Sequence, residues 1–322
     1  MRLRAARPRA RLCETSHVTS LLSRKDALGR STVLSRAEWL QDRREHHAWT
    51  DEVSRGHRQR RAAGMKHPVE DFLWEYYPYS PARLRRWTPG ADTALNGVID
   101  GDPLPQGFAS VDGMHQFHAD ALQTKVRERL RTDTAWVLGL QQQTHQRAAS
   151  FGCFGLHEWA MVLDQTPDQI RHTTWELRIS PRQLSDTIEN LGLRCTHFDA
   201  WRFFTPRAAA MNPVALSRQS QPGMDQPGCL HANMDLYKWS MRLQPLVPSS
   251  FVRAAFDLAR RIRTVDMRAS PYDFQALGLE PIDIEAAAGR AQFIEWQRGF
   301  SAEAQQLRDA LISVLTRVQE CL

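Results

Sequence analysis

The sequence predicts a helix-dominated α+β protein in which a small sheet is contributed by about residues 174–204. Most segments after residue 34 repeat apolar side chains at the 3.6-residue period of a helix, whereas residues 174–179 alternate apolar and polar side chains like a half-buried strand. A helical stretch follows at 181–190, and residues 194–204 have the composition of a second strand. This order of strand, helix and strand indicates that the fold is not purely helical.

The length and composition favour one folded body. The chain has 322 residues, of which 42% are hydrophobic, and this is sufficient for a sizeable core. We expect residues 1–33 to form a disordered basic tail and residues 34–322 to form a single globular domain. Residues 91–113 are rich in Gly, Asp and Pro, so we expect a loop or a short strand pair there and a weak internal boundary.

The net charge of +6 comes from the N-terminal end of the chain. Residues 1–30 carry eight Lys and Arg against two acidic residues, so residues 31–322 carry 34 charges of each sign. A basic binding surface on the globular part must therefore arise from clustering and not from an excess of basic residues.

The hydropathy and the cysteine spacing predict where in the cell the protein is located and whether it forms disulfides. No apolar run approaches the roughly 18 residues that span a bilayer, so we expect no contact with a membrane. The N-terminus is rich in Arg like a transit peptide but lacks the apolar segment of a secretory signal, so we expect a cytoplasmic protein. The cysteines form no C-x-x-C pair, which argues against a disulfide framework and against a cysteine zinc site. They are Cys13, Cys153, Cys195, Cys229 and Cys321.

The first predicted helix runs from Ser35 to about Gly64. Ser35 and Glu38 have the spacing of a capping box, and Leu34 with Trp39 that of a hydrophobic staple. Because the rest of this segment is polar, we expect it to be mostly a solvated face.

Residues 66–90 interleave aromatic rings with arginines, and they include a predicted helix from Pro68 to about Tyr77. Such a segment is either an amphipathic anchor packed on the core or a surface that stacks on bases and binds phosphates. Further helices are predicted at 115–149, at 249–267 and along the C-terminal segment, while residues 205–228 are expected to form a long ordered loop or flap. In the helix 249–267 the arginines expected to face outward are Arg253, Arg260 and Arg263.

Residues 229–244 form the most clearly sorted helix, entered through Gln226-Pro-Gly228 and ended by Pro245. At 100° per residue, a narrow charged strip is bordered on both sides by apolar stripes. This strip is either a solvent-facing surface or the lining of a cleft, in which residues one turn apart point at the same place. The strip consists of His231, Asp235, Lys238 and Arg242.

Four segments combine histidine or arginine with carboxylates, which act as acid–base partners or as metal ligands when the fold brings them together. The second and third of these pairs place both side chains on one face of a strand or helix and can converge, whereas the first pair is adjacent in sequence and diverges. The segments are His157-Glu158, His197-Phe-Asp199, His231 with Asp235, and Asp266 with Arg268 and Asp273. The sequence contains no phosphate-binding loop, dinucleotide fingerprint, serine-hydrolase elbow, H-E-x-x-H or zinc-deaminase motif, which excludes those classes.

Five stretches carry a family resemblance: KHPVEDFLWEYY at 66–77, FGCFGLHEWAMV at 151–162, RCTHFDAWRFFTP at 194–206, QPGCLHANMDLYKW at 226–239 and DMRASPYD at 266–273. Together they resemble a family of bacterial proteins commonly labelled 3-methyladenine DNA glycosylase, from about residue 35 to the C-terminus. The Leu-Pro-Gly-x-Gly hairpin of helix-hairpin-helix glycosylases is not evident in the sequence.

The resemblance implies a DNA repair hydrolase that removes a modified nucleobase by cleaving its N-glycosidic bond, with no cofactor required. A flipped base would stack between aromatic rings, while a carboxylate supports the oxocarbenium-like sugar and activates water. The carboxylate is expected at the bottom of an aromatic-lined cleft whose rim includes Arg83, Arg85, Arg86, Arg202 or Arg268. The motifs place no catalytic residue, so we choose candidates by their chemistry: Asp235, Asp199, His231 and Glu158 for catalysis, and Trp74, Tyr77, Arg194, Arg202, Asn233, Tyr237, Lys238 and Arg268 for substrate binding.

Two alternatives stay open. The first is a metal-dependent enzyme that acts on a small molecule, in which three histidines and a carboxylate bind Zn or Fe and leave a position for water or oxygen. Its ligands would be His157, His197 and His231 with Asp199, Asp235 or Glu158. The second is a non-enzymatic domain that binds a small molecule or a partner protein, with these polar residues forming a buried network that stabilises the fold.

Overall fold

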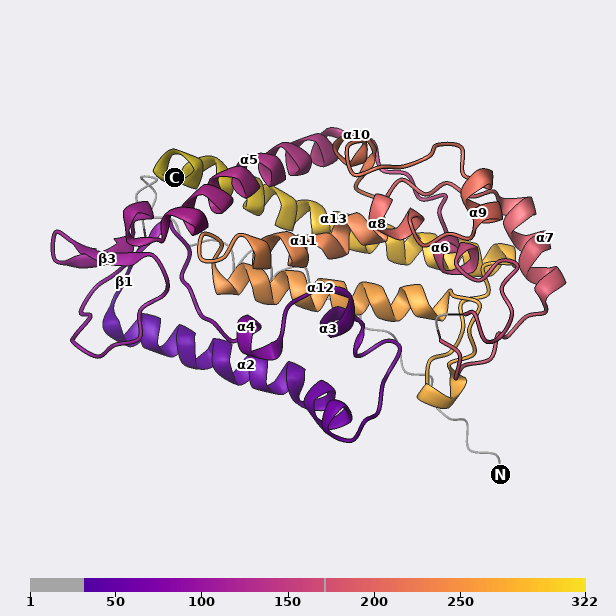
Figure 1. The fold of residues 1–322 in the computed structure, drawn as a ribbon, viewed down its shortest axis with the longest axis horizontal. Helices are drawn as coiled ribbons and strands as arrows, with labels where there is room; N and C mark the ends of the chain where they lie inside the picture. The colour runs from indigo at the N-terminus through magenta and orange to yellow at the C-terminus, as the bar shows by residue number, and fades with distance from the viewer. Residues whose placement is uncertain (1–31, 171) are drawn as a thin grey trace, which may run out of the picture.

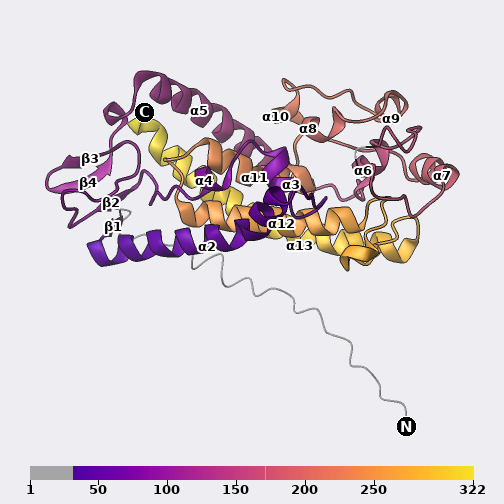
Figure 2. The same ribbon diagram turned by 60° about the horizontal axis from the view of Figure 1, so that its bottom comes forward.

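The computed structural model describes residues 32–170 and 172–322, and its long helices pack around helix α11 (Leu230–Arg242). Helix α11 packs against α12 (Ser249–Arg268) and α13 (Ala287–Val318), and α13 also packs against α5 (Thr124–Gln146) (Figure 1). Helix α2 (Arg36–Ala62) lies along α12, as Figure 2 shows from a second direction. The predicted helix-dominated α+β class is therefore confirmed.

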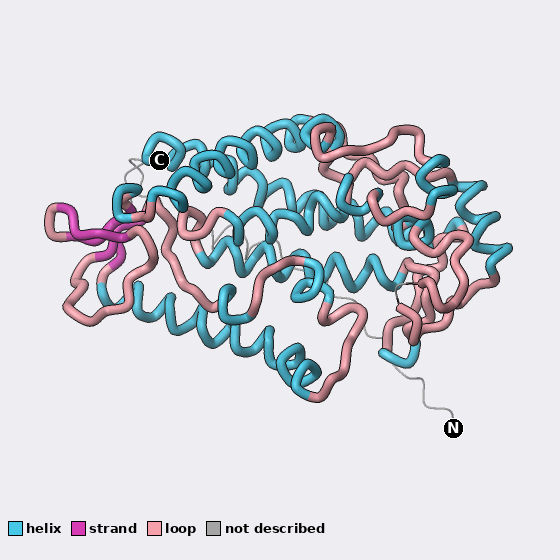
Figure 3. Tube along the Cα trace, in the orientation of Figure 1, coloured by secondary structure: helices cyan, strands magenta, loops and turns pink. Residues whose placement is uncertain are grey.

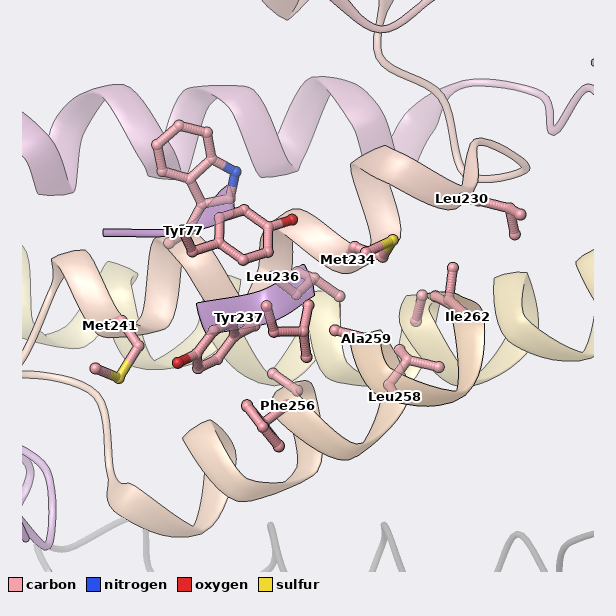
Figure 4. Packing of buried hydrophobic residues seen from close by; sticks show 14 of the residues in the cluster. Tyr77, Leu230, Met234, Leu236, Tyr237, Met241, Phe256, Leu258, Ala259 and Ile262 are labelled. Atoms are coloured by element: carbon pink, nitrogen blue, oxygen red, sulfur yellow. The ribbon is translucent and has the colours of Figure 1, made fainter. Parts of the chain in front are cut away.

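Helix α11 is an interior helix. All of its residues are buried except Lys238 and Arg242, so the charged strip is buried at His231 and Asp235 and reaches solvent at Arg242. Its apolar residues pack on Phe256, Ala259 and Ile262 of α12, as Figure 4 shows. The observed bounds agree with the prediction for 229–244, because the apolar periodicity and the flanking prolines are local signals.

The sheet lies at one end of the bundle and not in residues 174–204. Its four strands are β1 (Thr32–Leu34), β2 (Thr93–Leu95), β3 (Phe108–Val111) and β4 (Met114–Phe117), in the order β1-β2-β4-β3. Strands β1 and β2 are parallel and the other pairs are antiparallel. Asp112 and Gly113, both with positive φ, form the β3–β4 turn. An Asp-Gly pair is a strong hairpin signal, and the short strand pair expected within 91–113 is part of this sheet.

Residues 174–204 form a loop-rich region instead, at the opposite end of the bundle from the sheet (Figure 3). Only Leu177 pairs as in a sheet, in an isolated antiparallel bridge with Tyr272. The alternation at 174–179 was misleading because a strand also needs a neighbouring strand, which local pattern does not supply. Residues 174–204 contain α7 (Pro181–Leu191) and α8 (Phe198–Trp201), and three further short helices flank them in the sequence: α6 (Leu156–Ala160), α9 (Pro206–Met211) and α10 (Gln221–Met224).

Other local predictions agree with the structure only in part. The helix predicted at 115–149 begins at Thr124, because residues 114–117 pair in β4, and the loop expected at 205–228 contains the short helices α9 and α10. Helix α2 begins at the predicted capping box of Ser35 and Glu38, and the segment after it contains α3 (Phe72–Tyr76) and α4 (Pro81–Leu84). Short 3-10 turns occur at Ala119–Ala121, Gln275–Leu277 and Gln319–Cys321. The predicted basic tail lies outside the described residues, apart from Thr32 and Val33 in β1. None of the described helices is both long and apolar enough to span a membrane.

Candidate metal centre

Three histidines from distant segments meet inside the loop-rich end of the molecule. The ring centroids of His157 and His231 are 4.4 Å apart, and those of His197 and His231 are 5.4 Å apart. All three side chains are buried. The predicted convergence of the three histidines is therefore confirmed. The prediction that His157 and Glu158 diverge was wrong, because Nε2 of His157 lies 3.9 Å from Oε1 of Glu158.

A close approach of two backbones produces this convergence. Gly228, which precedes α11, has no side chain because a Cβ there would clash with the carbonyl oxygen of Ser150. The Gln226 side chain joins the same segments: its Oε1 accepts from the backbone N–H groups of Ser150 at 2.9 Å and Gly228 at 2.7 Å. The chain that leads to His157 is thus held against the beginning of the helix that carries His231.

Four residues form what we call the Asp266 cluster: His157, Glu158, Arg263 and Asp266. Nε2 of His157 lies 3.2 Å from Oδ2 of Asp266, and the Arg263 guanidinium donates to Glu158 at 2.6 Å and to Asp266 at 3.4 Å. The prediction that Arg263 faces outward was wrong: it is 1% exposed and its guanidinium lies 3.8 Å from the ring centroid of Phe72. Burial next to two carboxylates outweighs the usual tendency of an arginine to reach solvent.

The cluster contains a set of atoms suited to a metal ion. One ligand atom from each of His157, His231 and Asp266 lies within 4.8 Å of the other two. The second carboxylate oxygen of Asp266, Oδ1, is buried and has no hydrogen-bond partner among the described residues. We call these three residues the His–Asp set.

Burial and neighbouring charges shift the pKa values of the two imidazoles of this set in opposite directions. Burial lowers the pKa of His231, and His157 and His197 lower it further, so the His231 ring is neutral at pH 7. Burial also lowers the pKa of His157, but the Asp266 carboxylate outweighs this and raises it well above the ordinary value. Burial raises the pKa of Glu158, but Arg263 and His157 bring it down to about 2.

A second ionic group, which we call the Asp235 cluster, consists of Tyr77, Asp199, Arg218, Asp235 and Lys238. Lys238 Nζ donates to Asp199 at 2.8 Å and to Asp235 at 2.9 Å, and the Tyr77 hydroxyl donates to the other oxygen of Asp235 at 2.9 Å. Arg218 donates to Asp199 at 2.5 Å. Burial raises the pKa of Asp235, but Lys238 and His197 lower it more, so it ends below its ordinary value. Both carboxylates are therefore ionised and fully engaged.

A small cavity of about 20 Å³ adjoins the histidines. The side chains of His157, His197 and His231 line it, together with those of Cys153, Cys195 and Cys229. All three cysteines are free thiols. The remaining lining residues are mostly polar, with Ser150, Arg194, Thr196, Gln226 and Gln297 among them.

Most of the other predicted binding residues do not line this cavity. Tyr237 is buried among aromatic rings, and Asn233 bonds to Arg308 at 3.0 Å. The Trp74 ring stacks on His57, and Arg268 donates to the backbone of Glu280. Arg202 is exposed beside Asp199, which leaves Arg194 as the only one of the predicted substrate-binding arginines among the described lining residues.

The predicted arginine rim lies elsewhere. Arg83, Arg85 and Arg86 line a separate groove of about 1120 Å³ near the C-terminal end of α11, and none of the described residues that line it is acidic. The predicted arrangement, with Asp235 or Asp199 at the bottom of a cleft under these arginines, is therefore wrong, because both carboxylates are buried in the Asp235 cluster. The arginines of this groove, called the arginine groove below, are Arg43, Arg83, Arg85, Arg86, Arg129 and Arg242.

Sequence reasoning placed Asp266 in one of the four polar segments but left it out of the expected metal ligands, and it missed the three cysteines as a group. One signal was present: each of these cysteines precedes one of the three histidines by two or four residues, in Cys153/His157, Cys195/His197 and Cys229/His231. Asp266 gave no such signal, because its contact with His157 spans 109 positions. Comparisons with protein-family models, curated proteins and solved structures found no match for this chain.

Proposed function

We propose that the protein is a metal-dependent enzyme that acts on a small molecule, with the His–Asp set as its metal ligands. The observation that carries this proposal is the presence of three buried donor atoms within 4.8 Å of one another. Donors bound to one zinc or iron ion at about 2.1 Å are at most about 4 Å apart, so small side-chain shifts close the set around an ion.

The polar environment of Asp266 favours a cation. Its Oδ2 lies 3.2 Å from Nε2 of His157, a separation that suits two neighbouring ligands of one ion. Its buried Oδ1 has no protein partner among the described residues. Buried charges are usually either paired or bound to metals, and a divalent ion would take the place of the proton between His157 and Asp266.

Two imidazoles and one carboxylate leave coordination positions open for a reactant. This ligand combination suits iron with open positions for oxygen chemistry, and it also suits zinc with a bound water. The adjoining cavity of about 20 Å³ has room for one water-sized molecule or a diatomic ligand. Zinc in the site would favour water activation and iron would favour dioxygen chemistry.

Metal analysis of the purified full-length chain tests this proposal. We expect the His–Asp set to retain about one equivalent of zinc or iron after dialysis. His231→Ala and Asp266→Asn should each lose that equivalent, whereas the exposed residues His118 and Asp273 supply matched controls, His118→Ala and Asp273→Asn, that should keep it. Equal metal content in all five proteins, or none in the wild type, would contradict the proposal.

The arginine groove favours a second candidate, the modified-base hydrolase that the family resemblance implies. Six arginines line the groove, and clustered arginines bind phosphates, although Arg85 also pairs with Asp51, and Arg129 and Arg242 pair with Asp133. The eleven positions from His231 to Arg242 span about 16 Å along α11, so the groove and the His–Asp set lie near opposite ends of this helix.

Base release decides this second candidate. The full-length chain is incubated with methylated DNA, and free methylated purine is measured against an enzyme-free control. Release that is weakened in Arg86→Ala and kept in the exposed-residue control Glu52→Gln would support the hydrolase. No release above the control would remove it without affecting the metal proposal.

A further inference from the structure

Three free thiols from three separate segments line one cavity. Cys153 precedes α6, Cys195 precedes α8 and Cys229 is the N-cap of α11. Cysteines that serve as small core residues face apolar neighbours. Cys195 has such neighbours on one side, in a small cluster with Ala200 and Leu216, but all three cysteines also line a cavity with the polar residues Ser150, Arg194, Gln226 and Gln297.

His197 supplies an independent observation at the same place. Its side chain is fully buried, lines the cavity, and neither ring nitrogen has an aligned hydrogen bond among the described residues. Its Nε2 lies 3.3 Å from Oδ2 of Asp235, and Asp235 is itself held by Tyr77 and Lys238. A histidine that binds a metal through one nitrogen usually directs the other toward such a fixed carboxylate.

We propose that Cys153, Cys195, Cys229 and His197 form a second metal site, which binds a thiophilic metal through three thiolates and one imidazole. Three cysteines and one histidine are a common ligand set for zinc. Each thiol releases its proton to solvent when the metal binds. The site uses none of the ligands of the His–Asp set, so it does not depend on whether that set holds an ion.

The spacing of the sulfurs bears on the kind of metal. Among the described residues, only the His–Asp set already has three donor atoms within 4.8 Å of one another. The three sulfurs are therefore not all within 4.8 Å of one another, and side-chain rotation must bring them onto one ion. The cavity of about 20 Å³ has room for a single metal ion but not for an iron–sulfur cluster.

Cobalt substitution reports thiolate ligands directly. The purified full-length chain is stripped with a chelator under reducing conditions and titrated with Co²⁺, because cobalt bound to sulfur gives an intense near-ultraviolet charge-transfer band that cobalt bound only to nitrogen and oxygen lacks. We expect this band to saturate at about one equivalent. Its absence from the folded wild-type chain would overturn the proposal.

Variants separate the two metal sites. Cys153→Ser, Cys195→Ser and Cys229→Ser should each reduce or abolish the band, and His197→Ala should shift it, with folding verified by circular dichroism. Cys321 is exposed near the C-terminus, so Cys321→Ser is the matched control and should leave the band unchanged. Asp266→Asn should leave the band intact while removing metal from the His–Asp set. The reverse pattern, in which Asp266→Asn abolishes all metal binding and the serine variants bind normally, would refute this proposal and leave the proposed function standing.

Discussion

Two buried ionic clusters adjoin the N-terminal half of helix α11, and they differ in how completely their carboxylates are bonded. In the Asp235 cluster, one oxygen of Asp235 accepts from Tyr77 and the other from Lys238. In the Asp266 cluster, one oxygen of Asp266 is buried without a partner among the described residues. Because buried polar groups are usually satisfied, the saturated cluster is best explained by stability and the unsaturated one by a ligand.

The bonding of Asp235 and Asp199 argues against their predicted role in catalysis. Asp235 and Asp199 were the first choices for catalysis because they share segments with histidines. Their bonds to Lys238, Tyr77 and Arg218 leave neither carboxylate open to a substrate. No histidine lies near Asp266 in the sequence, so no local pattern pairs it with an imidazole.

The largest expected effect is on stability in the saturated cluster. Asp235→Asn removes one of the two carboxylates that hold the Lys238 ammonium, and we expect the free energy of unfolding to fall by about 3 kcal/mol. Urea denaturation followed by circular dichroism measures it. Glu52→Gln removes an exposed ion pair with Arg55 and should cost less than about 0.5 kcal/mol, so similar losses in the two variants would contradict the assignment.

The unsaturated cluster should respond instead to added metal. A metal at 100 times its dissociation constant stabilises the folded state by about 2.7 kcal/mol. We expect zinc or ferrous iron to raise the melting temperature of the wild-type chain, and Asp266→Asn to remove the part of this shift that arises at the His–Asp set. Because the thiol site can also contribute, the comparison is made in the Cys153→Ser background. If metal raises the melting temperature equally with and without the Asp266 carboxylate, the Asp266 cluster does not bind metal.

Acid should narrow the stability difference between wild type and Asp235→Asn. The folded pKa of Asp235 lies below its unfolded value, so its contribution is present above about pH 4 and is lost as the pH falls through the folded pKa. Each such group changes the free energy of unfolding by up to about 1.4 kcal/mol per pH unit in that range. Urea denaturation at pH 7, 4 and 3 checks this, and a constant difference would show that Asp235 is not held ionised.

The smallest stability effect is expected in the arginine groove. Arg86→Ala should change the free energy of unfolding by less than about 0.5 kcal/mol, because no buried partner is lost. If the groove binds nucleic acid, the same change should reduce the salt dependence of binding by about one unit in a log–log plot. Fluorescence anisotropy of a labelled DNA at several salt concentrations measures this. An unchanged slope would show that Arg86 does not contact phosphate.

Local patterns predicted the helices well and the sheet poorly. The capping box at Ser35 and Glu38 and the periodicity of residues 229–244 specified α2 and α11 to within a few residues. The alternation at 174–179 did not produce a strand, because a strand forms only where a partner strand lies beside it. The Asp112-Gly113 turn was a local hairpin signal and would have placed β3 and β4 correctly.

By itself the sequence determined which segments are helical and where polar, ligand-type side chains occur on them, since caps, prolines and apolar periodicity act over a few residues. Only the tertiary structure decided which carboxylate meets which imidazole. His157 reaches Asp266 across 109 positions, and Tyr77 reaches Asp235 across 158. Such contacts depend on how whole helices pack, and packing also decided that one buried carboxylate is saturated while the other keeps an oxygen without a described partner.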